Sequence, residues 1–205
     1  GLAKSFQGIL GSGDEADNSE FKKKQQQFLD MLSDSLIDLL TAQFKFLEAL
    51  NMKQNIAITK KALEDLKKGK DGKIPIEQVE TAIEVSKENK VMIDEAIASN
   101  KTITEESKEI FSSGLVDYGR GTRKIVNVGY ASKQYLSNVD GFGMGMLGNL
   151  EGIVFLVENI PPLTKTFLAS TDSLIQYSTN NNIPVPEEIS SVQKDKAAGE
   201  FAGYN

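Results

Sequence analysis

Glycines, basic residues and carboxylates are the residue types whose spacing in this chain could support chemistry. The run Gly143-x-Gly145-x-x-Gly148 has the literal spacing of a dinucleotide-binding fingerprint. That fingerprint binds a pyrophosphate only where it joins a strand to the N-terminus of a helix. The residues before it, 132–139, continue a helical pattern, and no strand–helix–strand unit follows. We therefore predict neither a nucleotide site nor any other cofactor.

Arg120, Arg123 and Lys124 form a compact basic patch. Arg120 and Lys124 are four residues apart, so on a helix they share a face and could bind a phosphate or a carboxylate. The alternative is that these cations pair with the acidic helix expected after Pro75. We favour ion pairing, because acidic residues are abundant in that helix.

Residue types that carry most protein catalysis are missing or badly spaced. The chain has no Cys and no His, which excludes thiol nucleophiles, disulfides, Cys/His zinc sites and histidine acid–base catalysis. The carboxylate pairs Glu105–Glu106 and Glu187–Glu188 are adjacent in sequence, so on a helix their side chains point apart. The Asp71-Gly72 turn lacks the oxygen ligands of a calcium loop. We predict no enzymatic activity and no metal site; an enzyme that uses Glu and Lys or Arg residues is the remaining alternative.

The most informative pattern is a series of glycines spaced for one stripe of a helix. They are Gly141, Gly145, Gly148 and Gly152. Each interior glycine costs a helix about 0.8–1 kcal/mol relative to Ala, so a compensating close contact is expected. Met144 and Met146, beside this stripe, could line an adaptable apolar pocket or simply fill the core.

A second small-residue stripe is expected on the helix that precedes this one. Gly114 and Gly121 are seven residues apart and lie on one helical face. Two such stripes allow two backbones to approach each other closely. We therefore predict that the third and fourth helices pack together through their glycines.

Residues 141–160 form the most apolar window and contain GxxxG twice, which in a bilayer associates helices. Against a membrane role, charged residues recur every seven positions from within this window, which is typical of one solvent-facing stripe of a bundle helix. They are Glu151, Glu158, Lys165 and Asp172. We favour a bundle helix in which these residues face solvent and Leu147, Leu150, Val154 and Val157 face inward. Membrane insertion of 141–160 is the alternative.

Helical periodicity extends along most of the chain, and no alternating strand pattern is present. The first helix spans 19–68, either as one piece or with a break near Asn51. Thr102 and Glu105 match a capping box that opens the third helix, and Pro161–Pro162 must interrupt the fourth. We predict an all-α, elongated bundle of four main helices with a long first helix and a proline-kinked fourth helix.

The expected domain organisation is a flexible arm at 1–18, a helical bundle at 19–182 and a polar tail at 183–205 with one short helix from Glu187. A formal net charge of −6 argues against nucleic-acid binding. The small, acidic stretch 11–18 would suit the tether of an exported lipoprotein whose lipid anchor lies outside this chain. We expect a non-enzymatic, exported or envelope-associated protein that binds a partner protein or an apolar ligand.

Overall fold

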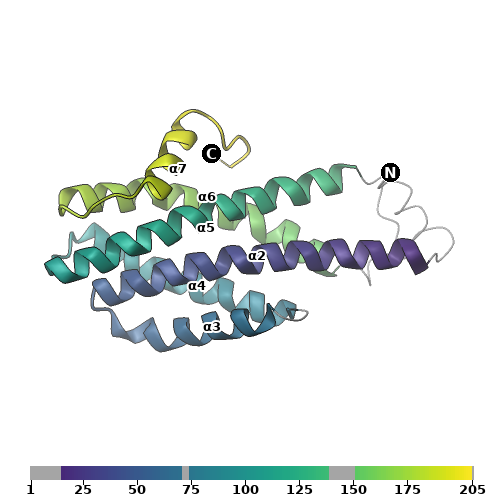
Figure 1. The fold of residues 1–205 in the computed structure, drawn as a ribbon, viewed down its shortest axis with the longest axis horizontal. Helices are drawn as coiled ribbons and strands as arrows, with labels where there is room; N and C mark the ends of the chain where they lie inside the picture. Colours follow the sequence, from purple (N-terminus) through teal and green to yellow (C-terminus); the bar gives the residue numbers. More distant parts are fainter. Residues whose placement is uncertain (1–14, 71–73, 139–150, 205) are drawn as a thin grey trace.

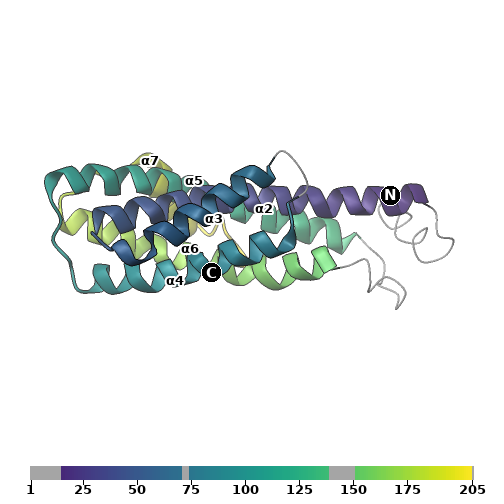
Figure 2. The same cartoon turned by 90° about the horizontal axis from the view of Figure 1, so that it is seen from below.

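The computed structural model describes residues 15–70, 74–138 and 151–204, with side chains from Phe21 onward. The described residues contain six α-helices, one short 3-10 helix and no strand, which confirms the all-α class. The elements are α2 (Glu15–Ala49), η1 (Lys53–Asn55), α3 (Ile56–Gly69), α4 (Ile76–Ala98), α5 (Glu105–Ser137), α6 (Glu151–Asn180) and α7 (Glu187–Ala197). Figures 1 and 2 show that α2, α5 and α6 run along the long axis of an elongated molecule.

Helix α2 is the central element, and its apolar 3-4 spacing predicts its buried face. Leu29, Leu32, Leu36 and Leu39 are all buried. The helix begins at Glu15, so it includes the last residues of the range 1–18 that the sequence assigns to an arm.

The first helix does not continue to Lys68; it ends at Ala49 and the chain turns back into α3. Asn51 adopts a left-handed φ of 56°, which Asn tolerates better than most residues. The Met52 and Asn51 amides bond back to the carbonyls of Leu47 and Glu48, the pattern of a Schellman C-cap. A single continuous helix is therefore wrong, and the break near Asn51 is confirmed.

Two predicted details of the later helices are also wrong. The N-cap of α5 is Thr104, whose hydroxyl accepts a hydrogen bond from the Ser107 amide at 3.1 Å, rather than a box built on Thr102. Pro161 and Pro162 lie inside α6, which continues through them. Both prolines lie on the exposed face, so water can bond the carbonyls one turn earlier that lose their amide partners.

The closest helix pairing joins α2 to α5, which lie side by side in both views (Figures 1 and 2). A Cβ atom built at Gly114 would lie 2.7 Å from Cε1 of Phe46, and one at Gly121 would lie 2.7 Å from Cγ of Leu39. The glycines of α5 therefore admit side chains of α2. The predicted pairing of this stripe with the fourth helix is wrong, because the stripe faces the first.

The residues after α6 form part of the packed structure. Helix α7 packs against α5, and a Cβ atom at Gly119 would lie 2.3 Å from the backbone of Glu188. Val192, Phe201 and Tyr204 are buried in a small apolar cluster with residues of α5 and α6. The short helix expected from Glu187 is present, and it holds the following residues against the bundle.

Candidate functional site

A cleft of about 270 Å³ opens between α5, α6 and the residues that follow α7. We call it the α5–α6 cleft. It lies just below the range of about 300–1,000 Å³ that is usual for small-molecule sites. Its described lining is mostly apolar: Gly129, Tyr130, Ser132, Lys133 and Leu136 from α5, Leu156, Val157, Ile160 and Pro161 from α6, and Ala202, Gly203 and Tyr204 from the C-terminal segment.

Ala202, Gly203 and Tyr204 form one wall of the cleft, which we call the C-terminal wall. Tyr130 of α5 binds this wall. Its hydroxyl donates to the carbonyl oxygens of Ala202 at 3.1 Å and Glu200 at 3.3 Å. Its ring contacts that of Tyr204, with the centroids 5.4 Å apart. The position of this wall therefore depends on a few contacts with a partly exposed tyrosine.

Tyr204 reaches into the cleft because α5 has a glycine opposite it. A Cβ atom at Gly129 would lie 2.1 Å from Oη of Tyr204, so any side chain there would displace the tyrosine. Tyr204 is 7% exposed, and its hydroxyl has no hydrogen-bond partner among the described residues. Burial, together with the neighbouring Tyr130, raises the pKa of Tyr204 above 10.0. The hydroxyl therefore keeps its proton at neutral pH and can donate it.

Lys133 supplies the charge at the rim of the cleft. It lies four residues, about one helical turn, after Gly129, so both residues are on the same face of α5. Its side chain is exposed and forms no ion pair with the described residues. The described lining is thus apolar in its interior, with an ammonium group at its rim and a buried phenol against α5.

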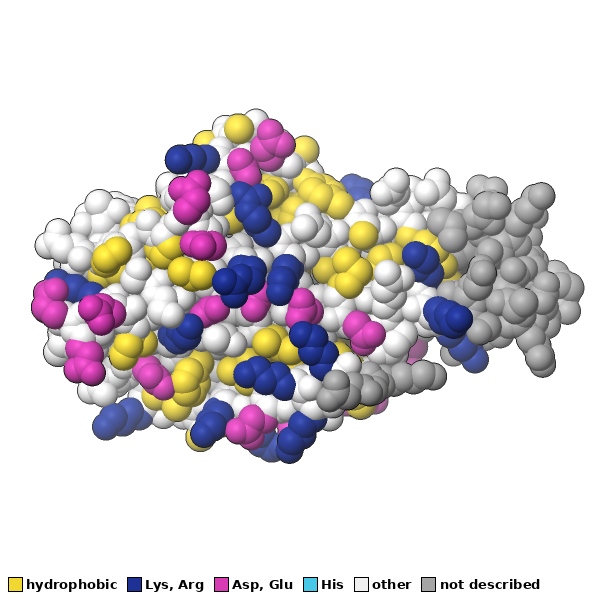
Figure 3. Space-filling model, viewed as in Figure 1, with side chains coloured by type: hydrophobic (Ala, Val, Ile, Leu, Met, Phe, Trp, Pro, Cys, Tyr) yellow, Lys and Arg dark blue, Asp and Glu magenta, His cyan; other side chains and the backbone are white. Residues whose placement is uncertain are grey.

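The basic patch of α5 is occupied by ion pairs, most of them with other helices. Arg123 binds Asp195 of α7 at 2.6 Å, and Arg120 lies 3.5 Å from Asp117 of its own helix. Lys124 binds Asp34 and Asp38 of α2 at 3.0 and 2.8 Å. Figure 3 shows basic and acidic side chains interleaved across the middle of the face that it draws. Pairing with the acidic helix α4, as the sequence predicts, is wrong, because α5 packs on α2 and α7.

The glycine stripe of the fourth helix is described only at its last member. Gly141, Met144, Gly145, Met146 and Gly148 lie outside the described residues. A Cβ atom at Gly152 would lie 2.6 Å from Oε1 of Gln25. That oxygen accepts a hydrogen bond from the Ile153 amide at 3.1 Å, so α2 supplies a cap for the first turn of α6. Gly152 thus makes room for a side chain of α2.

The seven-residue charge pattern of α6 is confirmed, because Glu151, Glu158, Lys165 and Asp172 are all exposed. The predicted inward position of two valines is wrong. Val154 is 44% and Val157 50% exposed, whereas Ile153, Leu156 and Ile160 occupy the buried face. None of the described helices combines the length and apolar composition needed to cross a bilayer.

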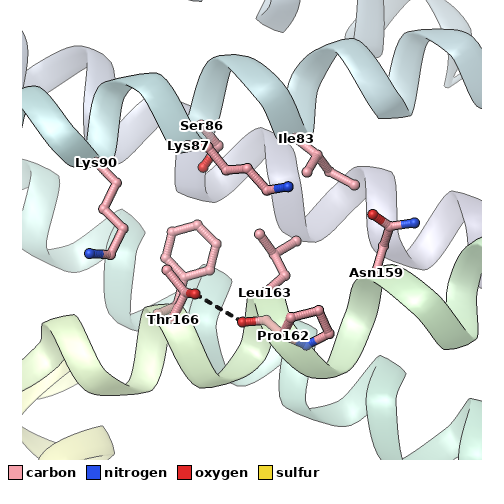
Figure 4. Close-up of a pocket in the computed structure, with 9 residues that line it drawn as sticks. Ile83, Ser86, Lys87, Lys90, Asn159, Pro162, Leu163 and Thr166 are labelled. Carbon is pink, nitrogen blue, oxygen red and sulfur yellow. Dashed lines mark hydrogen bonds between the residues drawn. The ribbon is translucent and has the colours of Figure 1, made fainter.

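A second, smaller cavity of about 70 Å³ lies between α4 and α6. Figure 4 shows Lys87 and Lys90 of α4 on one side of it, with Asn159, Pro162 and Thr166 of α6 on the other. Lys87 lies 3.4 Å from Glu84 and Lys90 lies 2.5 Å from Asp94, so both cations already have acidic partners. This cavity is also too small for more than a few atoms, and we regard the α5–α6 cleft as the better candidate.

Comparisons with protein-family models, curated proteins and solved structures find no match to this chain. Among the described residues, no group of three or more acidic side chains could hold a metal ion. The α5–α6 cleft is therefore the feature of this protein from which we infer its function.

The α5–α6 cleft has no clear signature in the sequence. Two weak signals were present in the chain: Gly129, which follows Gly121 by eight residues on α5, and the aromatic pair Phe201 and Tyr204 in an otherwise polar tail. Neither signal indicates a ligand until the C-terminal segment is placed against α5.

Proposed function

We propose that this protein is a non-enzymatic helical-bundle protein that binds a small amphiphilic molecule in the α5–α6 cleft. The observation that carries the proposal is the composition of the cleft. Leu136, Leu156, Val157 and Ile160 provide an apolar interior that the chain's own described side chains leave open. Lys133 at its rim favours a ligand that has a polar end as well as an apolar body.

Val157 offers a direct test, because it lines the cleft and is half exposed, so a larger side chain can narrow the cleft without entering the core. Val157→Trp should weaken binding of the fluorescent apolar probe N-phenyl-1-naphthylamine at least tenfold in a fluorescence titration. Val154→Trp is the matched control, since Val154 is on the same helix with similar exposure and does not line the cleft. The control should change the Kd by less than twofold.

Two outcomes would contradict the proposal. One is that the unaltered protein does not bind the probe. The other is that Val154→Trp and Val157→Trp weaken binding equally, which would mean that the probe binds a general apolar surface of α6. A related possibility is that the cleft binds an apolar side chain of a partner protein. In that case the partner protein would compete with the fluorescent probe for the cleft.

Membrane insertion of residues 141–160 is the second candidate function. It is favoured by Val154 and Val157, two exposed apolar side chains of α6 that lie within this window. Dye-loaded anionic liposomes distinguish the two functions. Ligand binding in the cleft predicts no leakage at pH 7 or pH 5, whereas leakage that disappears when 141–160 is replaced by a polar helix supports insertion.

We also propose that the protein is exported to the periplasm or cell envelope. The support for export is a chain without cysteine, which cannot form mispaired disulfides in an oxidising compartment. Fractionation of the source cells, followed by immunoblotting for this chain, tests it. Recovery of the protein in the cytoplasmic fraction would contradict this part of the proposal and leave ligand binding untouched.

A further inference from the structure

We propose that the ligand of the α5–α6 cleft carries a carboxylate head on a single apolar chain, and that Lys133 and the hydroxyl of Tyr204 bind that head. The inference rests on the proposed function and adds the chemical class of the ligand. It depends on the position and charge of Lys133 and Tyr204, because the other polar side chains of the lining, Tyr130 and Ser132, already donate to backbone carbonyls.

Tyr204 is the first of these groups. Its residue is more than nine-tenths buried, its side chain lines the cleft, and its hydroxyl is unpartnered among the described residues. Because the hydroxyl has no acceptor among the described residues, it is free to donate a hydrogen bond to a ligand oxygen in the cleft. A carboxylate suits this position because it only accepts hydrogen bonds.

Lys133 is the second group, and its positive charge favours a ligand with a negatively charged head group. It is the sole charged residue among the described lining of the cleft, and it follows Gly129, which contacts the Tyr204 hydroxyl, by one turn of α5. A flexible lysine at the rim can keep its ammonium group in water while reaching toward a nearby head group. A cationic head group would be repelled at this rim.

The apolar part of the cleft accounts for the rest of the ligand. Leu136, Leu156, Val157 and Ile160 offer aliphatic surface without further hydrogen-bonding side chains. Polar groups distributed along a ligand, as in a sugar or a peptide, would lose their water here without replacement. One chain with one polar end fits these surroundings.

Three ten-carbon probes that differ only in the head group test the inference. Decanoate, decanol and decyltrimethylammonium should be titrated by calorimetry at pH 7.5 against the unaltered protein, Lys133→Gln and Lys133→Arg. Lys133→Gln should weaken decanoate binding about tenfold, leave decanol within twofold and improve binding of the cationic probe. Lys133→Arg should retain the decanoate affinity. Tyr204→Phe should weaken decanoate more than decanol.

Lys165→Gln is the charge control, because Lys165 is exposed on α6 and does not line the cleft. It should leave all three affinities unchanged. Thermal unfolding of each variant checks that the C-terminal wall is still in place.

The inference is overturned if Lys133→Gln changes the affinities for decanoate and decanol by the same factor. That result would make Lys133 a packing residue whose aliphatic stem covers the cleft. It is also overturned if Lys165→Gln has the same effect as Lys133→Gln. The proposed function fails separately, if Val157→Trp leaves decanol binding unchanged.

Discussion

Several glycines of helix α5 face a neighbouring element, and in two regions of the helix this has opposite consequences. In the α2–α5 interface, Gly114 and Gly121 admit Phe46 and Leu39, and both of these side chains are buried. Near the other end of the helix, Gly129 admits the tip of Tyr204, with Ile160 beside it, and an open cleft remains next to these residues. A glycine thus shows where something approaches the helix, while the approaching group determines whether the result is core or cavity.

The two regions also differ in how their charged side chains are paired. In the α2–α5 interface, Lys45 binds Asp117 at 2.7 Å, and Lys124 bridges two aspartates of α2. At the α5–α6 cleft, Lys133 and the Tyr204 hydroxyl have no such partners among the described residues. Structural charges are therefore paired in one region, and the groups available to a ligand lie in the other.

The largest expected effect is the loss of stability when the filled region is overpacked. Gly121→Leu places a side chain where Leu39 and Asp38 already lie, and should lower the free energy of unfolding by about 3 kcal/mol. Val157→Trp at the half-exposed rim of the cleft should change it by less than about 0.5 kcal/mol. Urea denaturation measures both. Equal effects would mean that the two regions do not differ in packing.

A smaller effect is expected at the wall of the cleft. Tyr130→Phe removes the hydroxyl that donates to Glu200 and Ala202, at a cost of about 0.5–1.5 kcal/mol to the contacts of the C-terminal segment. Hydrogen exchange should become faster in residues 200–204 while the α2–α5 interface stays protected. Unchanged exchange would show that the ring contacts alone hold this wall.

The smallest effect is the pH dependence of the ion pairs on α2. Burial by itself would raise the pKa of Asp34, but hydrogen bonds and ion pairs with Lys70 and Lys124 outweigh it, so the pKa lies below 3.8. A carboxyl group whose pKa is lowered by folding stabilises the protein above about pH 4, and this contribution is lost as the pH falls through the folded-state pKa.

Thermal unfolding between pH 7 and pH 3 tests this contribution. Asp34→Asn should reduce the decrease in Tm slightly, because the side chain is partly exposed and its ion pairs are screened. Lys133→Gln, at the cleft, should not alter the pH dependence. A profile for Asp34→Asn identical to that of the unaltered protein would mean that the ion pairs contribute nothing measurable.

Local sequence patterns determined the class of the fold and many of its buried positions. The spacing of Leu29, Leu32, Leu36 and Leu39 predicts the buried face of α2, and the seven-residue recurrence from Glu151 to Asp172 predicts the exposed face of α6. Both are properties of one helix, and a periodicity of 3.6 residues is sufficient to read them. The sequence likewise allowed a break near Asn51, although it left a continuous helix over 19–68 open.

Tertiary structure decided which helices meet and where space remains. Gly114 and Gly121 show that something approaches α5, but only the packed bundle shows that it is α2 rather than α6. The partners of Arg123 and Lys124 were mispredicted for the same reason, because an ion pair depends on which helices are neighbours. The α5–α6 cleft exists because residues far apart in the sequence, Gly129 and Tyr204, come together and leave an unfilled volume beside them. A cavity is the volume that remains unfilled when the helices pack together, so no local pattern of residues predicts it.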